Sequence, residues 1–380
     1  GEAYEYRRAH QPRLKLGPFL ATLEGWLEVE ATLSAREQRT AQRLYEALCL
    51  EGYTGAVDAV RRHIRELERR RHPSTTAFIP QSFASGEAYQ FDWSHEYVEL
   101  GGVEQVVKVA HVRLCHSRVF FLVAYPRESQ EMVFDSHARA FEFFGGVPRR
   151  GIYDNLKPAV DAIFVGRARR YNRRFLVMCN HYLIEPTACT PASGWEKGQV
   201  ENQVGNVREW LFTPKVRCAD LAELNAHLAA RCLQLARERA HPDQSDRKII
   251  ELWDEERAEL RAMPIPFDGY AEKSALVSTT CLVGFDRNRY SVESRYVRQV
   301  ATVRAYAERI VIVCGGEIAG EHPRCFERGQ TLYNPWHYVA ALARKPGALR
   351  NGAPFKDWNL PGSMTRLRER LARHADGDRQ

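Results

Sequence analysis

The sequence has 380 residues, of which 44% are hydrophobic, and a net charge of +7 from 55 Lys and Arg residues against 48 Asp and Glu residues. This length suggests two to four domains, and no apolar run approaches the roughly 18 residues of a membrane span. The nine cysteines are scattered singly without a Cys-x-x-Cys pair, which makes a zinc ribbon unexpected and indicates a reducing, cytoplasmic compartment.

The first part of the chain predicts a small helical domain. Residues 1–16 are polar and indicate a linker or arm, and residues 17–72 show apolar stripes at helical spacing in three segments. The last segment is rich in arginine, so we predict a helix-turn-helix DNA-binding domain. The simpler alternative is a helical bundle with a solvated basic face. The arginines expected to reach DNA are Arg61, Arg62, Arg65 and Arg69.

After a Pro- and Ser-rich linker at 73–86, the pattern changes to strands. Two alternating runs meet at Gly101-Gly102, which predicts a hairpin, and a third apolar strand follows. Helix, strand, helix, strand and helix then complete residues 87–213. This element order is typical of a ribonuclease-H-like α/β catalytic core.

The remainder of the chain predicts three further parts. Residues 214–264 have helical spacing with a break at His241-Pro242, and residues 265–328 carry five short strands. Short strands with turn residues between them indicate a small β-barrel, and one of them is expected over 275–283. Residues 329–380 form a basic C-terminal tail.

Three acidic residues stand at the positions where this core would bring them together. Asp92 lies within the first strand, Asp154 at the end of the fourth, and Glu201 on the last helix. Three adjacent carboxylates repel one another unless they bind divalent cations, so we predict a catalytic site holding two Mg²⁺ or Mn²⁺ ions. Taken singly, each acid has an ordinary explanation as an exposed strand, turn or helix residue.

Basic residues near these acids are predicted to contact the DNA backbone. They could instead belong to a solvated loop. Three other acids, Asp135, Asp161 and Glu196, are weaker candidates for the metal site, and His111 with His116 does not predict zinc. The predicted DNA contacts are Lys157, Arg167, Arg169, Arg170, Arg173, Arg174 and Lys197.

At these residues the sequence resembles the DDE transposases of the IstA type, which two-gene bacterial insertion sequences encode. The resemblance lies in Tyr-Gln-Phe-Asp-Trp at 89–93, Gly-Ile-Tyr-Asp-Asn-Leu-Lys at 151–157 and Ser-Gly-Trp-Glu-Lys-Gly-Gln-Val-Glu-Asn at 193–202. It implies Asp92, Asp154 and Glu201 as metal ligands and a retroviral-integrase-like core followed by a β-barrel. Family members usually carry a further helix-turn-helix ahead of the part that corresponds to residue 1.

The resemblance also implies partners that the composition does not show. These are transposon-end DNA, target DNA, further copies of the chain in a dimer or tetramer, and an IstB-type AAA+ ATPase. A nucleoid-associated location follows from the same resemblance. We therefore predict a transposase that cleaves the 3′ ends of its element and joins them to target DNA by two-metal-ion phosphodiester transfer. Two alternatives stay open at this point: a non-catalytic, transposase-derived DNA-binding regulator, and a ribonuclease-H-like nuclease that cuts without joining.

Overall fold

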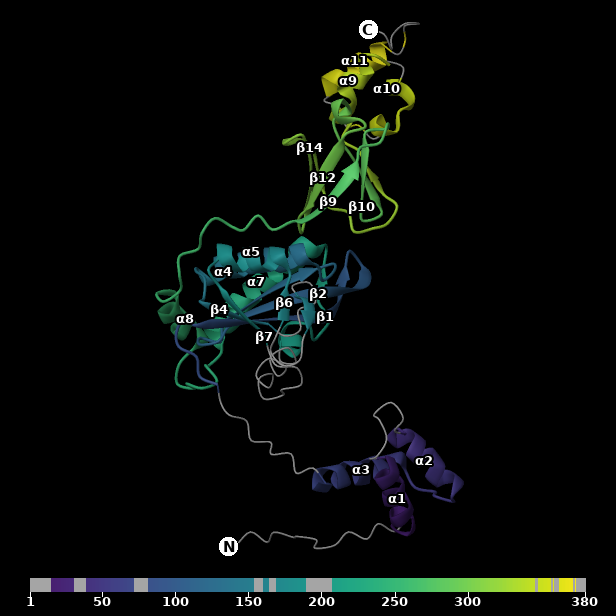
Figure 1. The fold of residues 1–380 in the computed structure, drawn as a ribbon, viewed down its shortest axis with the longest axis vertical. Coiled ribbons are helices and arrows are strands. Elements are labelled where there is room, and N and C mark those ends of the chain that lie inside the picture. The colour runs from purple at the N-terminus through teal and green to yellow at the C-terminus, as the bar shows by residue number, and fades with distance from the viewer. Residues whose placement is uncertain are drawn as a thin grey trace. The chain divides into compact units, whose positions relative to one another are not determined.

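The computed structural model describes residues 15–30, 39–71, 81–153, 160–163, 169–188, 207–345, 348–356, 358, 362–371 and 373 (Figure 1). The chain divides into two compact units, Gly1–Ile79 and Pro80–Gln380. Among the described helices, none combines the length and the apolar character that crossing a membrane requires.

The first unit contains a short 3₁₀ helix followed by three α-helices. These are η1 (Gly17–Phe19), α1 (Leu20–Glu30), α2 (Ala41–Leu50) and α3 (Val57–Arg71). The side-chain oxygen of Thr40 caps α2 by accepting a hydrogen bond from the Arg43 amide at 3.3 Å. The apolar stripes predicted from the sequence meet in one core, which includes Leu23, Leu44, Leu48 and Val60.

The second unit is built around a mixed sheet with strand order β3-β2-β1-β4-β7. Gly101 and Gly102, with φ of 58° and 82°, turn β1 back into antiparallel β2, which confirms the predicted hairpin. Strands β4 and β7 continue the sheet in parallel, and β8 extends the far end of β1. The strands are β1 (Ala88–Leu100), β2 (Val103–Leu114), β3 (Phe120–Tyr125), β4 (Arg150–Tyr153), β7 (Glu185–Ala188) and β8 (Arg217–Cys218).

Apolar side chains cover both faces of this sheet, giving a mixed α/β architecture. One face packs against α4 (Gln130–Phe144), α5 (Arg173–His181) and α8 (Ile249–Arg257). The other packs against α7 (Leu221–Glu238) and the helical residues 207–211. Gly145, in the left-handed region at φ 79°, ends α4 as predicted. A two-stranded sheet is formed by β5 (Val160–Ile163) and β6 (Arg169–Tyr171).

The C-terminal strands form two small sheets with their own apolar core. The single strand predicted over 275–283 is wrong, because the chain turns at 277–281 and pairs with two different sheets. One sheet has the order β14-β13-β12-β9 and the other β10-β11-β15. The strands are β9 (Ala271–Leu276), β10 (Leu282–Phe285), β11 (Asn288–Ser291), β12 (Val300–Ala305), β13 (Arg309–Cys314), β14 (Glu317–Pro323) and β15 (Thr331–Leu332).

Short helices accompany these sheets. The 3₁₀ helix η3 (Ser294–Tyr296) lies between β11 and β12, and the others follow β15. The expected basic tail at 329–380 therefore starts with a strand that pairs with β11. The later helices are η4 (Pro335–Tyr338), α9 (Val339–Leu342), α10 (Ala348–Asn351), η5 (Ala353–Phe355) and α11 (Gly362–Leu371).

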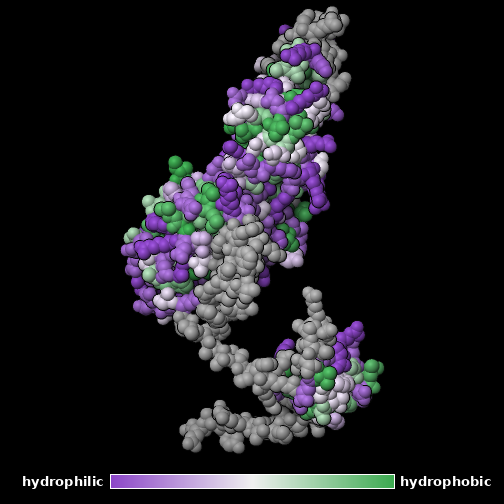
Figure 2. All heavy atoms as spheres, in the orientation of Figure 1, coloured by the Kyte–Doolittle hydropathy of each residue, from purple (hydrophilic) through white to green (hydrophobic). Residues whose placement is uncertain are grey.

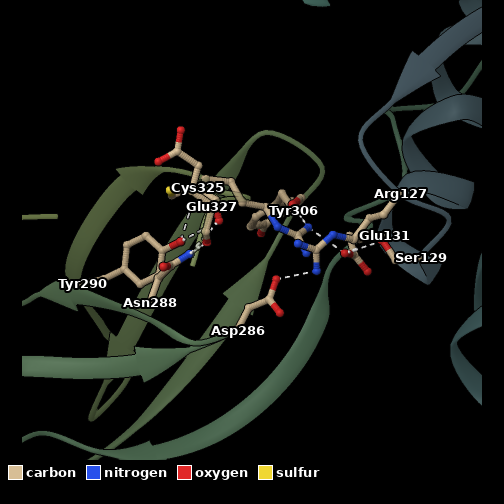
Figure 3. A network of polar contacts seen from close by, with 10 residues as sticks. Arg127, Ser129, Glu131, Asp286, Asn288, Tyr290, Tyr306, Cys325 and Glu327 are labelled. Atoms are coloured by element: carbon tan, nitrogen blue, oxygen red, sulfur yellow. Dashed lines mark hydrogen bonds and ion pairs between the residues drawn. The ribbon is translucent and has the colours of Figure 1, made fainter. Parts of the chain in front are cut away.

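A buried ion pair joins α4 to the small sheets. The Arg324 guanidinium lies 2.6 Å from the Glu131 carboxylate, and the two side chains are only 3% and 4% exposed. Ser129 donates a hydrogen bond to Glu131 at 2.6 Å, and nearby Arg127 pairs with Asp286 at 2.5 Å (Figure 3). Separating two buried, oppositely charged groups at this distance costs free energy, because each charge would be left without its partner. This contact therefore holds the small sheets against α4.

Candidate active site

Asp92 lies in the middle of β1, at the centre of the sheet. Its Cα partner on β2 is His111, and its Oδ1 accepts a hydrogen bond from the Trp93 amide at 2.8 Å. The side chain is half-buried. Its face of β1 also carries Ser94 and Glu96, because alternate residues of a strand point the same way.

The neighbouring strand β4 approaches Asp92 from the other side. Its parallel register with β1 pairs Tyr89 with Gly151 and ends with Phe91 opposite Tyr153. In the sequence, Asp92 directly follows Phe91 and Asp154 directly follows Tyr153. Asp154 itself lies outside the described residues, so the structure positions Asp92 and the strand that leads to Asp154.

A buried polar network joins these two strands on the opposite face of the sheet. The Tyr89 and Tyr153 hydroxyls are hydrogen-bonded to each other, and His137 of α4 lies 3.2 Å from the Tyr153 hydroxyl through Nε2. Nδ1 of His137 lies 2.6 Å from the carbonyl oxygen of Val133, and Phe91 stacks on the imidazole. Burial lowers the pKa of His137 to about 4, so the ring is neutral at physiological pH.

The low pKa of His137 predicts an acid-sensitive contribution to stability. Between about pH 6.5 and pH 4 the unfolded histidine binds a proton that the folded one rejects. Stability is therefore retained above pH 6.5 and falls by roughly 1.4 kcal/mol per pH unit below it, for this one group. Denaturant unfolding of wild type and His137→Gln at pH 7 and pH 5 measures the difference. An identical pH dependence in the two proteins would contradict the assignment.

A second polar cluster lies on the Asp92 face. Glu96, 3% exposed, receives two hydrogen bonds of 2.9 Å from the guanidinium of Arg208. His111 lies 2.8 Å from the Ser94 hydroxyl, and burial, followed by the charge of Arg208, lowers its pKa to about 3. The buried carboxylate is thus neutralised by an arginine and not by the histidine.

Sequence reasoning did not identify Arg208 or Glu96. In the sequence, Glu96 resembles an ordinary exposed residue of an alternating strand, and Arg208 resembles an ordinary solvated residue of a helix. Arg208 follows Glu201 by seven residues, which is two turns of an α-helix. This spacing is the one feature of the sequence that could have indicated a position for Arg208 near the predicted site.

Several predicted site residues fall outside the described part of the chain. These are Asp154, Glu201, Lys157, Arg167 and Lys197, and the weaker candidate Glu196 is also among them. The backbones of Arg69, Arg169, Arg170 and Asp161 are described but their side chains are not. Within the described residues, no group of three or more His, Cys, Asp or Glu is arranged to hold a metal.

The other predicted DNA contacts differ in their surroundings. Arg62, Arg65 and Arg173 are exposed, while Arg61 contacts Asp58 and Gln42 within the first unit. Arg174 donates to the Asp268 carbonyl at 2.8 Å and stacks on Tyr270. Its guanidinium is thus already engaged within the chain, and its role in DNA binding stays a prediction.

The weaker metal candidate Asp135 is part of a different cluster. Its carboxylate accepts a hydrogen bond from the Tyr125 hydroxyl at 2.6 Å and pairs with Arg139 at 2.8 Å. Burial raises the pKa of Asp135 despite these partners. The described contacts give it a structural role within α4 and β3.

The sequence is similar over almost its whole length to bacterial transposases. It is 40% identical over 375 residues to a transposase for insertion sequences IS1326/IS1353 from Pseudomonas aeruginosa, covering 96% of this chain and 73% of the relative. A transposase from Aminobacter aminovorans is 41% identical with the same coverage, and the IS21 transposase from Pseudomonas aeruginosa is 26% identical over 88% of this chain and 83% of its own. Residues 262–334 match the Mu transposase C-terminal domain family.

Solved structures with similarity to the chain include a retroviral integrase core and a chain of an intasome. The catalytic core domain of BIV integrase aligns with a TM-score of 0.34 and 14% identity, covering 46% of this chain and 97% of that one. A chain of the simian T-cell lymphotropic virus intasome in complex with the PP2A regulatory subunit B56 gamma aligns with a TM-score of 0.38 and 13% identity, covering 74% of this chain and 95% of that one.

Proposed function

The chain belongs to the transposases of bacterial insertion sequences, and from this premise we propose that it cleaves the 3′ ends of its element and joins them to target DNA. The proposed site consists of Asp92, Asp154 and Glu201 in a ribonuclease-H-like core. The observation that carries the proposal is the register of β1 and β4, which ends with Phe91 opposite Tyr153. Adjacent parallel strands are about 4.8 Å apart, so a β4 strand continued by one residue would place Asp154 beside Asp92.

The contacts of Arg208 support Glu201 as the third member of this site. Arg208 binds Glu96 and the His95 carbonyl, whereas Arg217 and Cys218 pair with Glu99 and Leu100. From residue 208 to residue 218 the chain therefore runs in the same direction as β1. Traced the other way, from residue 218 to residue 208, it runs toward the part of β1 that contains Asp92.

Distances along helix and strand agree with this assignment. Seven residues of an α-helix, the separation of Glu201 and Arg208 in the sequence, would span about 10 Å, and four strand residues from Asp92 to Glu96 span about 13 Å. Residues seven apart also share one face of a helix. A helix that continued back from Arg208 for two turns would bring Glu201 to the Asp92 face of β1, which supports the proposal.

The chemistry of these residues fits hard divalent cations. Carboxylate oxygens are the ligands that Mg²⁺ and Mn²⁺ prefer, and Asp92 is accessible enough, being half-buried, to meet a ligand. Asp92, Asp154 and Glu201 would hold two such ions, which when bound activate the attacking oxygen and stabilise the leaving oxygen of a phosphodiester. The Glu96–Arg208 pair keeps a further buried carboxylate from adding uncompensated negative charge.

The first unit is proposed to bind DNA as a helix-turn-helix domain. Arg62 and Arg65 of α3 are exposed, which leaves them able to reach phosphates or base edges. The C-terminal small sheets are proposed to form a β-barrel of the Mu transposase type. Assembly into a dimer or tetramer and cooperation with an IstB-type AAA+ ATPase belong to the same proposal, as does action at the bacterial nucleoid.

A joining assay tests the function. Labelled transposon-end DNA and a target plasmid are incubated with the protein, with and without Mg²⁺. The proposal predicts joined strands only with metal. Cut but unjoined ends would favour the nuclease alternative, and binding without either product would favour the regulator.

The Arg208 contact gives a separate prediction. Arg208→Gln removes both hydrogen bonds to Glu96 and leaves this buried carboxylate without its cation on the face of β1 that carries Asp92. We expect metal-dependent joining to fall by roughly 10- to 100-fold, the range that follows when the surroundings of metal ligands are disrupted. Arg217→Gln is the matched control, because Arg217 also pairs with a glutamate of β1, Glu99, whose side chain is 31% exposed whereas that of Glu96 is 3% exposed. Equal activity of Arg208→Gln and Arg217→Gln would contradict the positioning role, whereas DNA binding without metal should be unchanged in both.

A further inference from the structure

An aromatic cluster lies beyond the small sheets, and no step of the proposed reaction uses it. Trp336 and Trp358 pack edge to face with ring centres 5.3 Å apart, and Phe355 packs on Trp358 at 5.5 Å. Tyr338 contacts both Phe355 and Tyr333. We call these five residues the Trp336 surface.

Trp336 is the exposed member of this surface. Its side chain is 62% exposed and Tyr333 is 36% exposed, whereas Phe355 is only 5% exposed. A buried tryptophan is usual in a protein core, but an exposed one leaves a ring face for a ligand.

The backbone that carries Trp336 is firmly held. Ser291 of β11 accepts a hydrogen bond from the Asn334 amide at 2.7 Å, and its hydroxyl lies 2.9 Å from Nδ1 of His337. The Tyr338 hydroxyl donates to the Thr280 carbonyl at 2.9 Å. The indole of Trp336 is therefore presented from a fixed support, which reduces the conformational entropy lost on binding.

Basic residues outnumber acidic ones in the sequence around the Trp336 surface. Between Tyr333 and Arg373 the sequence has eight basic residues and only two acidic ones, Asp357 and Glu369. Among the described residues next to the aromatic cluster, Arg344, Lys345 and Lys356 are exposed. Figure 2 shows hydrophilic and hydrophobic colours side by side over the described part of this end of the chain. The eight basic residues are Arg344, Lys345, Arg350, Lys356, Arg366, Arg368, Arg370 and Arg373.

We propose that the Trp336 surface binds unpaired nucleotides of DNA. An exposed aromatic ring stacks on a base only when that base is not already stacked within a duplex, and nearby cations bind the phosphates on either side. The positive charge favours a polyanion such as DNA over an apolar protein segment as the binding partner. The exposed indole favours unpaired bases, because in a duplex the base faces are already stacked and the outer surface presents phosphates. Unpaired nucleotides arise wherever a strand has been cut or displaced.

Fluorescence anisotropy of the full chain, with EDTA present and no divalent metal, tests this site. Two labelled probes share one duplex, and one of them carries an additional unpaired strand of about ten nucleotides. Trp336→Ala is expected to weaken binding of the probe with the unpaired strand roughly tenfold, as loss of one stacked base does. Duplex binding should change less than twofold, because the first unit is proposed to bind duplex DNA.

Two matched variants separate stacking from other effects. Trp336→Phe keeps an aromatic ring and should retain most of the preference for the unpaired strand. Val339→Ala alters a neighbouring exposed apolar side chain, 41% exposed, that cannot stack, and it should behave as wild type. Thermal unfolding midpoints equal to that of wild type exclude misfolding.

Equal affinity of Trp336→Ala and wild type for the unpaired strand would overturn the inference. So would an equal loss on both probes. Loss of self-association with unchanged DNA affinity would assign the surface to protein contacts instead. The measurement contains no metal and no cleavage step. Its result is therefore independent of the proposed catalytic site: either proposal can be contradicted while the other is supported.

Discussion

Replacing Asp92 by asparagine is expected to lower metal-dependent strand joining by roughly a thousandfold or more. The substitution keeps the size of the side chain and its place in β1 but removes the negative charge that we propose holds a divalent cation. A thousandfold loss corresponds to about 4 kcal/mol of transition-state stabilisation, a plausible share of what two-metal catalysis supplies. Gel quantification of joined strands at saturating Mg²⁺ measures it.

The matched control for Asp92→Asn is Glu104→Gln. Glu104 is an exposed carboxylate of β2 that pairs with Lys215 at the protein surface, so neutralising it should leave joining unchanged. DNA binding in EDTA should be the same for both variants and wild type. Joining by Asp92→Asn at the wild-type rate would exclude Asp92 from the active site.

The second large effect is expected at the buried ion pair between α4 and the small sheets. Arg324→Met leaves the carboxylate of Glu131 buried without its cation, which typically costs about 3–5 kcal/mol. The small sheets should then separate from α4 more readily than wild type. Hydrogen exchange of backbone amides in β10–β14, followed by mass spectrometry, reports this opening directly.

An exposed arginine provides the comparison for Arg324. Arg309 pairs with Glu321 at 3.0 Å, but both side chains are about half exposed, so Arg309→Met should cost less than about 1 kcal/mol. The double variant Glu131→Met/Arg324→Met removes both buried charges and should recover much of the lost stability. Equal exchange rates in Arg324→Met and Arg309→Met would contradict the importance of the buried pair.

The sequence predicted most elements of the α/β unit because their signals are local. Alternation along β1 and β2 and the Gly101-Gly102 turn required no knowledge of the tertiary structure. The apolar spacing of α4 and its terminal Gly145 were equally local. The mistake at 275–283 has a physical cause. β10 forms a local hairpin with β11, whereas β9 pairs with β12, which lies beyond both of these strands in the sequence.

The surroundings of the candidate site were less predictable. The hydrogen bonds of Arg208 to Glu96 and of Tyr153 to Tyr89 join residues 112 and 64 positions apart. No periodicity within a single helix or strand encodes such pairs. Asp92 could be selected as a candidate from its motif, but its neighbours His111 and Glu96 became evident only from the strand register.

The most direct test of the account replaces Mg²⁺ by Fe²⁺ and maps where the bound metal cuts the protein backbone. Ascorbate and peroxide generate hydroxyl radicals at bound iron, and these cleave only nearby peptide bonds. If Asp92, Asp154 and Glu201 share one metal site, fragments ending near all three residues should appear together. Excess Mg²⁺ and the Asp92→Asn substitution should suppress all three cuts. Cleavage near Asp92 without cleavage near Asp154 and Glu201, or cuts that persist in Asp92→Asn, would contradict a common site.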